Sequence, residues 1–125
     1  MAITPDQVIQ NPTLGFDTPD GRRVLVLTGV VLFHFQGTST DWRRDSLDWE
    51  IGPPWNKLEG VAPMAALGSI ANDQNATNAG WAVDEVTWEG EVNDAIRLRA
   101  KLAVRDTDGM ILRLTYTATA IGTVA

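Results

Sequence analysis

Two stretches near the C-terminus alternate between apolar and polar residues with a period of two, and this alternation constrains the fold more than any other feature. In residues 95–105 the even positions are apolar and the odd positions are mostly basic. Residues 110–120 repeat the pattern, with Arg113 and threonines at most odd positions. A period of two is typical of a β-strand with one face in the core and one in water. The segment 95–121 therefore predicts a long β-hairpin.

The same alternation predicts the turn of this hairpin. A two-residue turn at Asp108-Gly109 would place Val104 opposite Arg113, so that charged residues would face core residues along the whole ladder. A three-residue loop over 107–109 instead places Val104 opposite Leu112. We therefore expect the longer loop, with a positive φ at its glycine.

Composition and charge restrict the class of protein. The 125 residues are 44% hydrophobic and 21% charged, so the chain is long enough for one folded domain (1–125) and is not disordered. The absence of cysteine excludes disulfides and thiol catalysis, and a single histidine argues against a zinc or copper site. The formal net charge of −6 argues against nucleic acid, because phosphate binding requires a basic field. We expect no cofactor, no metal and no nucleic-acid partner.

No part of the sequence predicts membrane insertion or secretion. The longest apolar run, 24–35, is too short to span a bilayer. Residues 1–12 lack the basic and apolar regions of a secretory signal. We expect a soluble protein without membrane contact, located in the cytoplasm or in a virion-type assembly.

The N-terminal part, residues 1–21, predicts an arm or short edge strand, and the strongest strand of the chain follows it. Residues 1–21 are rich in proline and glycine, and 18–21 predict a turn in which Gly21 has a positive φ. Residues 22–36 are apolar on both faces, which is typical of a covered strand or of a strand at a subunit interface. Gly29 within it predicts a bulge or a close backbone approach. Our hypothesis for an oligomer interface is the face formed by Leu25, Leu27, Val31, Phe33 and Phe35.

Residues 37–60 combine tryptophans, charged residues, glycines and prolines, and we expect a long loop region with a short strand near 47–51. Long loops in compact domains are commonly functional. The tryptophans could form an aromatic platform for a sugar ring or a protein, or they could cap one end of the core. The carboxylates could act in glycoside hydrolysis or bind a cation. The candidate ligand-binding residues are Trp42, Trp49, Trp55, Asp41, Asp45, Asp48 and Glu50.

Two further segments predict strands. Residues 61–71 fit a buried strand better than a short helix. Residues 81–89 alternate irregularly, because Val83 and Val86 cannot both face the core of a regular strand, and a bulge near Asp84-Glu85 would reconcile them. The basic positions of 95–105 indicate a solvated face that is balanced by acidic neighbours.

No catalytic residue is predicted. His34 lies between two phenylalanines on a strand, with no orienting group or second metal ligand nearby in the sequence, so a structural histidine is the better interpretation. The nucleophile elbow of serine hydrolases and the glycine-rich phosphate-binding motifs are absent.

Together these patterns predict an all-β protein, an antiparallel sandwich or jelly-roll-like fold of about six to eight strands, with a small barrel as the alternative. The expected role is non-enzymatic, structural or protein-binding, with self-association. One alternative is a carbohydrate- or small-ligand-binding module that uses the loop tryptophans. Another is a small barrel enzyme that uses the carboxylates of 41–50 with His34.

Overall fold

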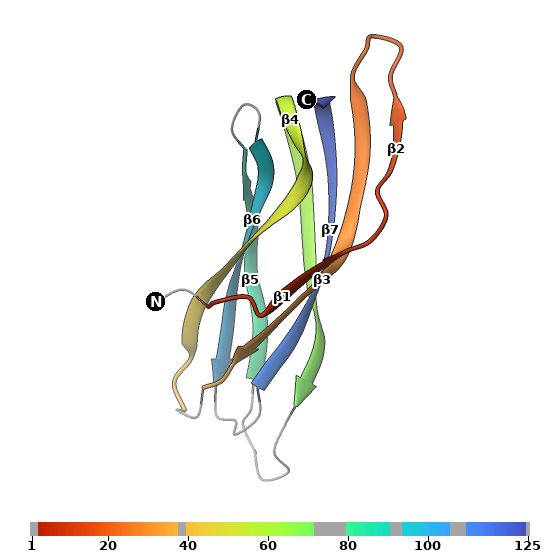
Figure 1. The fold of residues 1–125 in the computed structure, drawn as a ribbon. Helices are drawn as coiled ribbons and strands as arrows, with labels where there is room; N and C mark the ends of the chain where they lie inside the picture. The colour runs from red at the N-terminus through yellow and green to blue at the C-terminus, as the bar shows by residue number, and fades with distance from the viewer. Residues whose placement is uncertain (1–2, 38–39, 72–79, 91–93, 106–109, 125) are drawn as a thin grey trace.

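A computed structural model describes residues 3–37, 40–71, 80–90, 94–105 and 110–124 (Figure 1). These residues form seven antiparallel strands and no helix, which confirms the all-β prediction. None of them belongs to a helix long and apolar enough to cross a membrane. The strands are β1 (Gln7–Gln10), β2 (Leu14–Asp17), β3 (Arg23–Phe35), β4 (Arg43–Ala71), β5 (Gly80–Glu89), β6 (Asp94–Arg105) and β7 (Met110–Val124).

The strands form one sheet in the order β1-β3-β7-β4-β6-β5, with β2 also paired to β3. The 29-residue strand β4 joins the two parts of this sheet. Its residues 43–51 pair with β6 and its residues 57–71 pair with β7. Figure 1 shows β4 running the length of the molecule, turning, and running back. The predicted two sheets are thus replaced by one folded sheet, which is not closed into a barrel over the described residues.

The predicted hairpin pairing between 95–105 and 110–121 is wrong, because β4 lies between β6 and β7. Leu102 of β6 pairs with Asp45 of β4 and Val83 of β5. Leu114 of β7 pairs with Leu67 of β4 and Val31 of β3. Alternation determines which face of a strand is buried but not which strand lies beside it. The predicted loop at 107–109 and its glycine lie outside the described residues.

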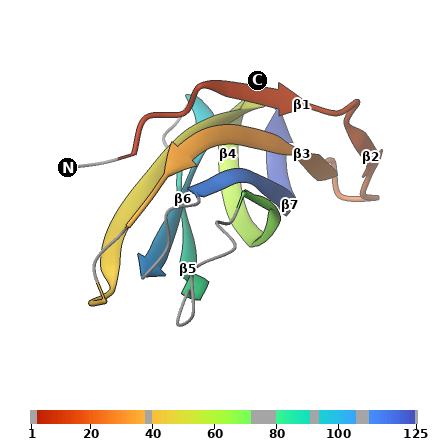
Figure 2. The ribbon, with the colours of Figure 1, turned by 90° about the horizontal axis from the view of Figure 1, so that it is seen from below.

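The predicted faces of these strands agree with the observed burial. The even positions of β6 from Ile96 to Val104 are 0% exposed, whereas Arg97, Arg99 and Lys101 are exposed. Seen along the strands (Figure 2), the sheet curls from β1 and β3 on one side to β5 on the other. The core occupies the inside of this curl, with side chains from β3, β4, β6 and β7.

The prediction of a long loop region over 37–60 is wrong from Arg43 onward, where β4 begins, while the short strand predicted near 47–51 is confirmed as part of β4. Leu47, Trp49 and Ile51 point into the core, while Asp48 and Glu50 point outward, so this charged segment follows the same period of two. Gly52 and Pro53 lie where the register of β4 against β6 is interrupted, at the turn of β4. The strand predicted for 61–71 is confirmed as the second half of β4.

Four smaller predictions are confirmed. The arm supplies two short edge strands, β1 and β2, both on β3. Gly21 closes the predicted turn with a φ of 85°. The register of β5 against β6 shifts between Val83 and Glu85, which is the predicted bulge. Gly29 has its predicted close approach, since an added Cβ would collide with Ile9 O and the Tyr116 hydroxyl.

Candidate functional site

The three tryptophans of 37–60 do not form an exposed platform. Trp49 is 3% exposed and Trp55 is 0% exposed, so both belong to the core. Trp42 precedes β4 and is partly exposed. The guanidinium of Arg105 lies 4.7 Å from the centre of its ring and that of Arg44 lies 5.8 Å away. Among the tryptophans of 37–60, a sugar ring therefore has no exposed pair of indoles to stack on.

Two of the acidic candidates on β4, Asp48 and Glu50, are held in ion pairs on one outer side of the sheet. Asp48 accepts two hydrogen bonds from Arg99, at 2.7 Å and 3.0 Å. Glu50 accepts one from Arg97 at 3.0 Å. Lys101 contacts Glu85 at 3.1 Å and Arg44 contacts Asp84 at 3.3 Å. We call this surface of β4 (43–51), β6 and β5 the charged face. It confirms that the basic side of β6 is balanced by acidic neighbours.

These pairs make the carboxylates poor candidates for catalysis. The hydrogen bonds from Arg99 lower the pKa of Asp48, whereas a general acid at neutral pH needs a raised pKa. Asp48 in turn raises the pKa of Arg99, so each partner holds the other in its charged form. The carboxylates of Asp48 and Glu50 act as cross-strand partners of the arginines on β6, and these pairs align β4 with β6.

A shallow hollow of about 290 Å³ lies on the charged face. Its two cations already have partners, since Arg44 pairs with Asp84 and Lys101 pairs with Glu85. The Asp45 carboxylate accepts a hydrogen bond from the backbone N–H of Ser46 at 2.9 Å. Asp41 is exposed ahead of β4 and does not line the hollow. The lining residues are Arg44, Asp45, Ser46, Asp84 and Lys101.

The single histidine is a surface residue that holds the N-terminal arm. His34 Nδ1 lies 2.6 Å from Asp6 Oδ2, and both side chains are more than half exposed. The backbone N–H of Asp6 also donates to Leu32 O at 2.8 Å, so this contact marks where β1 joins β3. Within the part of the chain that the structure describes, no group of three or more His, Cys, Asp or Glu could hold a metal ion.

The opposite outer side of the sheet has a different chemistry. Four large hydrophobic residues are exposed in the described part of the chain: Ile9 (42%), Leu14 (68%), Phe16 (62%) and Met64 (69%). They come from β1, β2 and β4, yet all four lie on the same side. Ile9 pairs with Val30, Leu14 with Val26, Phe16 with Val24, and Met64 with Thr117, and each of these partners points away from the core.

The register arranges the residues of this surface in four rows that run across the strands. We call these four rows together the apolar face. No residue in the rows is charged and none is fully buried. Threonines of β7 occupy the centre, with alanines and Met64 on β4 to one side and the large residues of β1 and β2 to the other. The rows are Phe16-Val24-Ile121, Leu14-Val26-Thr119-Ala62, Thr28-Thr117-Met64 and Ile9-Val30-Thr115-Ala66.

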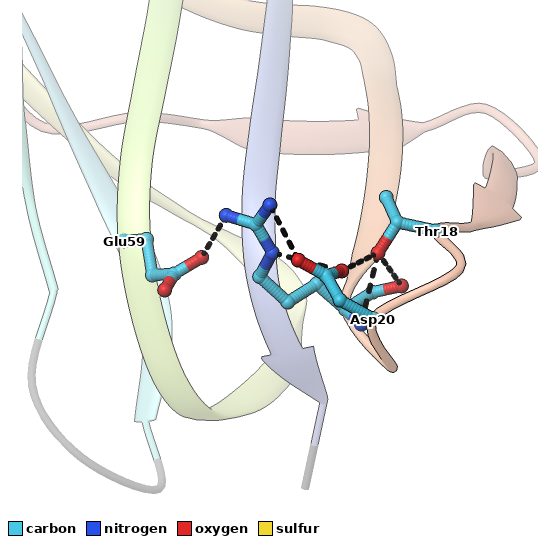
Figure 3. Close-up of polar contacts among 4 residues, drawn as sticks. Thr18, Asp20 and Glu59 are labelled. Atoms are coloured by element: carbon cyan, nitrogen blue, oxygen red, sulfur yellow. Dashed lines mark hydrogen bonds and ion pairs between the residues drawn. The ribbon is translucent and has the colours of Figure 1, made fainter.

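Charged residues lie at both ends of the apolar face. At one end Arg22 contacts Asp20 at 2.8 Å and Glu59 of β4 at 3.0 Å (Figure 3), crossing the end of β7. Hydrogen bonds from Arg22 and Thr18 lower the pKa of Asp20 to about 2. At the other end Arg113 pairs with Leu32, beside the His34 contact. The apolar face is thus an uncharged area with charged residues at both ends.

The interface hypothesis placed the wrong side of β3 at the surface. All five residues of that hypothesis are 0–2% exposed and belong to the core of a single chain, so a second molecule cannot reach them. The outward side of β3 is the one carrying Val24, Val26, Val30 and Leu32. The residues on the buried side are Leu25, Leu27, Val31, Phe33 and Phe35.

Sequence reasoning did not select the residues that protrude most from the apolar face. Leu14 and Phe16 lie in the proline- and glycine-rich arm, where no periodic pattern is long enough to define a face. Met64 could have been found, because Ala62, Met64 and Ala66 occupy alternate positions of a strand.

Comparison with known proteins yields no relative: no family model matches the chain, and no curated protein or solved structure matches it significantly.

Proposed function

We propose that the protein is a non-enzymatic structural or assembly component that binds another protein surface through its apolar face. The observation that carries this proposal is that, among the residues whose burial the structure describes, all four exposed large hydrophobic residues lie on this one uncharged face. Single exposed hydrophobic residues are normal on any protein. Their collection into one area is typical of an interaction surface.

The composition of the surface supports the same role. Protein interfaces have an apolar centre depleted of charge and a polar rim. The apolar face has this arrangement, with the Arg22 cluster at one end and Arg113 with His34 at the other.

Strand β2 further supports a role in binding another protein. All four residues of β2 are exposed, so the strand contributes little to the core. It nevertheless extends the sheet beside β3 and presents Leu14 and Phe16 outward, where they are available to a partner.

The other candidate roles have less support. The carbohydrate module depends on Trp49 and Trp55, which are buried. The enzyme depends on carboxylates such as Asp48 and Glu50, which are paired with arginines. An assembly component of this kind would act in the cytoplasm or in a virion-type particle.

Site-specific photo-crosslinking in cells that produce the protein tests the proposal. A photoreactive amino acid replaces Met64 on the apolar face or, as the control, Thr87, an exposed strand residue of the charged face. We expect covalent adducts with protein from position 64 and none from position 87. Equal yields from both positions, or no adduct from position 64, would contradict the proposal.

A further inference from the structure

We propose that the partner of the apolar face is the same face of a second copy, so that the protein forms a two-fold homodimer by stacking sheet on sheet. This inference rests on the proposed function, because it names the partner that the apolar face binds. In such an isologous contact, each copy contributes the same residues.

Charge favours a second copy as the occupant. The chain has a formal net charge of −6, so two copies repel each other wherever their acidic surfaces meet. The four rows of the apolar face contain no charged residue, and pairing them brings no like charges together. A strongly charged partner would find no opposite charge there, and burying its own charge without a counterpart would be unfavourable.

The size of the face fits a weak, specific dimer. Four strands at about 4.8 Å spacing and four rows at about 6.8 Å spacing cover roughly 500 Å² in projection. Projecting side chains such as Leu14, Phe16 and Met64 add contact area to this value. The smallest specific interfaces bury about 600 Å² on each partner, so the face is sufficient for a reversible dimer but not for an obligate one.

The charged face offers no equivalent surface. Three of its basic residues on β6 are paired within the chain, Arg97 with Glu50, Arg99 with Asp48 and Lys101 with Glu85. A second copy would have to displace or desolvate these pairs, which is unfavourable. A second copy that binds the apolar face displaces no ion pair, because the four rows contain no charged residue.

Sedimentation velocity of the full chain tests the inference over concentrations from about 1 µM to about 1 mM, the range in which a small interface is partly formed. We expect the wild type to change from monomer to dimer within it. Met64→Glu and Phe16→Glu should raise the midpoint concentration at least about tenfold, because each places two carboxylates in one interface. Thr87→Glu adds the same charge on the charged face and should leave the midpoint unchanged.

A second measurement does not depend on any variant. Met64 is 69% exposed in the single chain, so hydrogen peroxide should oxidise it readily at low protein concentration. Oxidation of Met64, followed by mass spectrometry of its peptide, should slow as the dimer forms. An oxidation rate that is independent of protein concentration would overturn the inference.

The outcomes separate this inference from the proposed function. A wild type that stays monomeric at every concentration overturns the inference that a second copy binds the apolar face. A dimer whose midpoint concentration is the same in both glutamate variants as in the wild type overturns it too. Adducts from position 64 to a different protein would then still support the proposed function. Monomeric protein without adducts from position 64 would overturn both.

Discussion

The ring of Trp49 lies 5.6 Å from the ring of Tyr116, with 53° between the ring planes. Trp49 belongs to the half of β4 that pairs with β6, and Tyr116 belongs to β7, which pairs with the other half. The contact therefore joins the two parts of the folded sheet across the core. The Tyr116 hydroxyl is buried, and within the described residues it has no hydrogen-bond partner.

Removing this hydroxyl should not weaken the fold. An unpaired buried hydroxyl is unfavourable because it has lost its hydrogen bonds with water, so we expect Tyr116→Phe to leave the free energy of unfolding unchanged or to raise it by about 1 kcal/mol. Tyr116→Ala, which also removes the ring, should lower it by about 3–5 kcal/mol. Urea unfolding measures both. A loss above about 1 kcal/mol in Tyr116→Phe would show that the hydroxyl has a partner.

Burial should also shift the ionisation of this residue. Loss of solvation raises the pKa of Tyr116 from 10.0 to about 12. The folded state thus binds the proton more tightly than the unfolded state. Its contribution to stability is fully present below pH 10 and is lost as the pH rises toward 12. Because Tyr116 is the only tyrosine, absorbance at 295 nm reports it alone. Ionisation near pH 10 with the circular dichroism unchanged would disprove the shift.

Gly29 should not tolerate a side chain. Its Cα faces Ile9 O and the Tyr116 hydroxyl, and an added methyl group would overlap both. We expect Gly29→Ala to lower the free energy of unfolding by about 1–3 kcal/mol, as overpacking commonly does. Gly60→Ala is the matched control, since its nearest neighbour would be Ile121 Cγ2 at 4.0 Å. Thermal unfolding of the two variants should differ clearly, and equal melting temperatures would argue against the close approach.

The Asp48–Arg99 pair predicts a dependence of stability on acid pH. The pKa of Asp48 is below its usual 3.8 because Arg99 donates hydrogen bonds to it. Its contribution is therefore present above about pH 4 and is lost as the pH falls through the lower, folded-state pKa. Asp48→Asn should be slightly less stable than the wild type at neutral pH, with a difference that shrinks in acid and in high salt. Urea midpoints between pH 2 and 7 would measure this, and a constant difference would exclude the linkage.

The strands were predictable from the sequence because alternation is a local property. The buried positions of β6 and β7, the bulge near Asp84 and the turn at Gly21 follow from patterns within a few residues. The pairing of strands was not predictable in this way. β4 lies between β6 and β7. Each of its two long segments alternates as the partner strand of a hairpin would, so alternation alone does not distinguish the two pairings.

The side of β3 that faces the core could not be identified from the sequence, since both sides are apolar. The register supplies the missing information. Val30 pairs with Thr115 and Val26 with Thr119, so the outward side of β3 continues the threonine side of β7. The surplus of apolar surface on β3 was predictable from the sequence, whereas the side that stays exposed was not, because the chain itself covers the side of Leu25 and Phe33.

The central place of the last strand has a consequence for synthesis. Arg23 pairs with Gly122, which is far from it in the sequence, and β7 lies between β3 and β4. While the chain emerges from a ribosome, β3 and the second half of β4 must therefore wait with unpaired edges until β7 follows. Such edges are prone to pair with other chains. The part of the sheet around β3 and the second half of β4 should thus form only after β7 has been synthesised, and a nascent chain lacking β7 should need the protection of a chaperone.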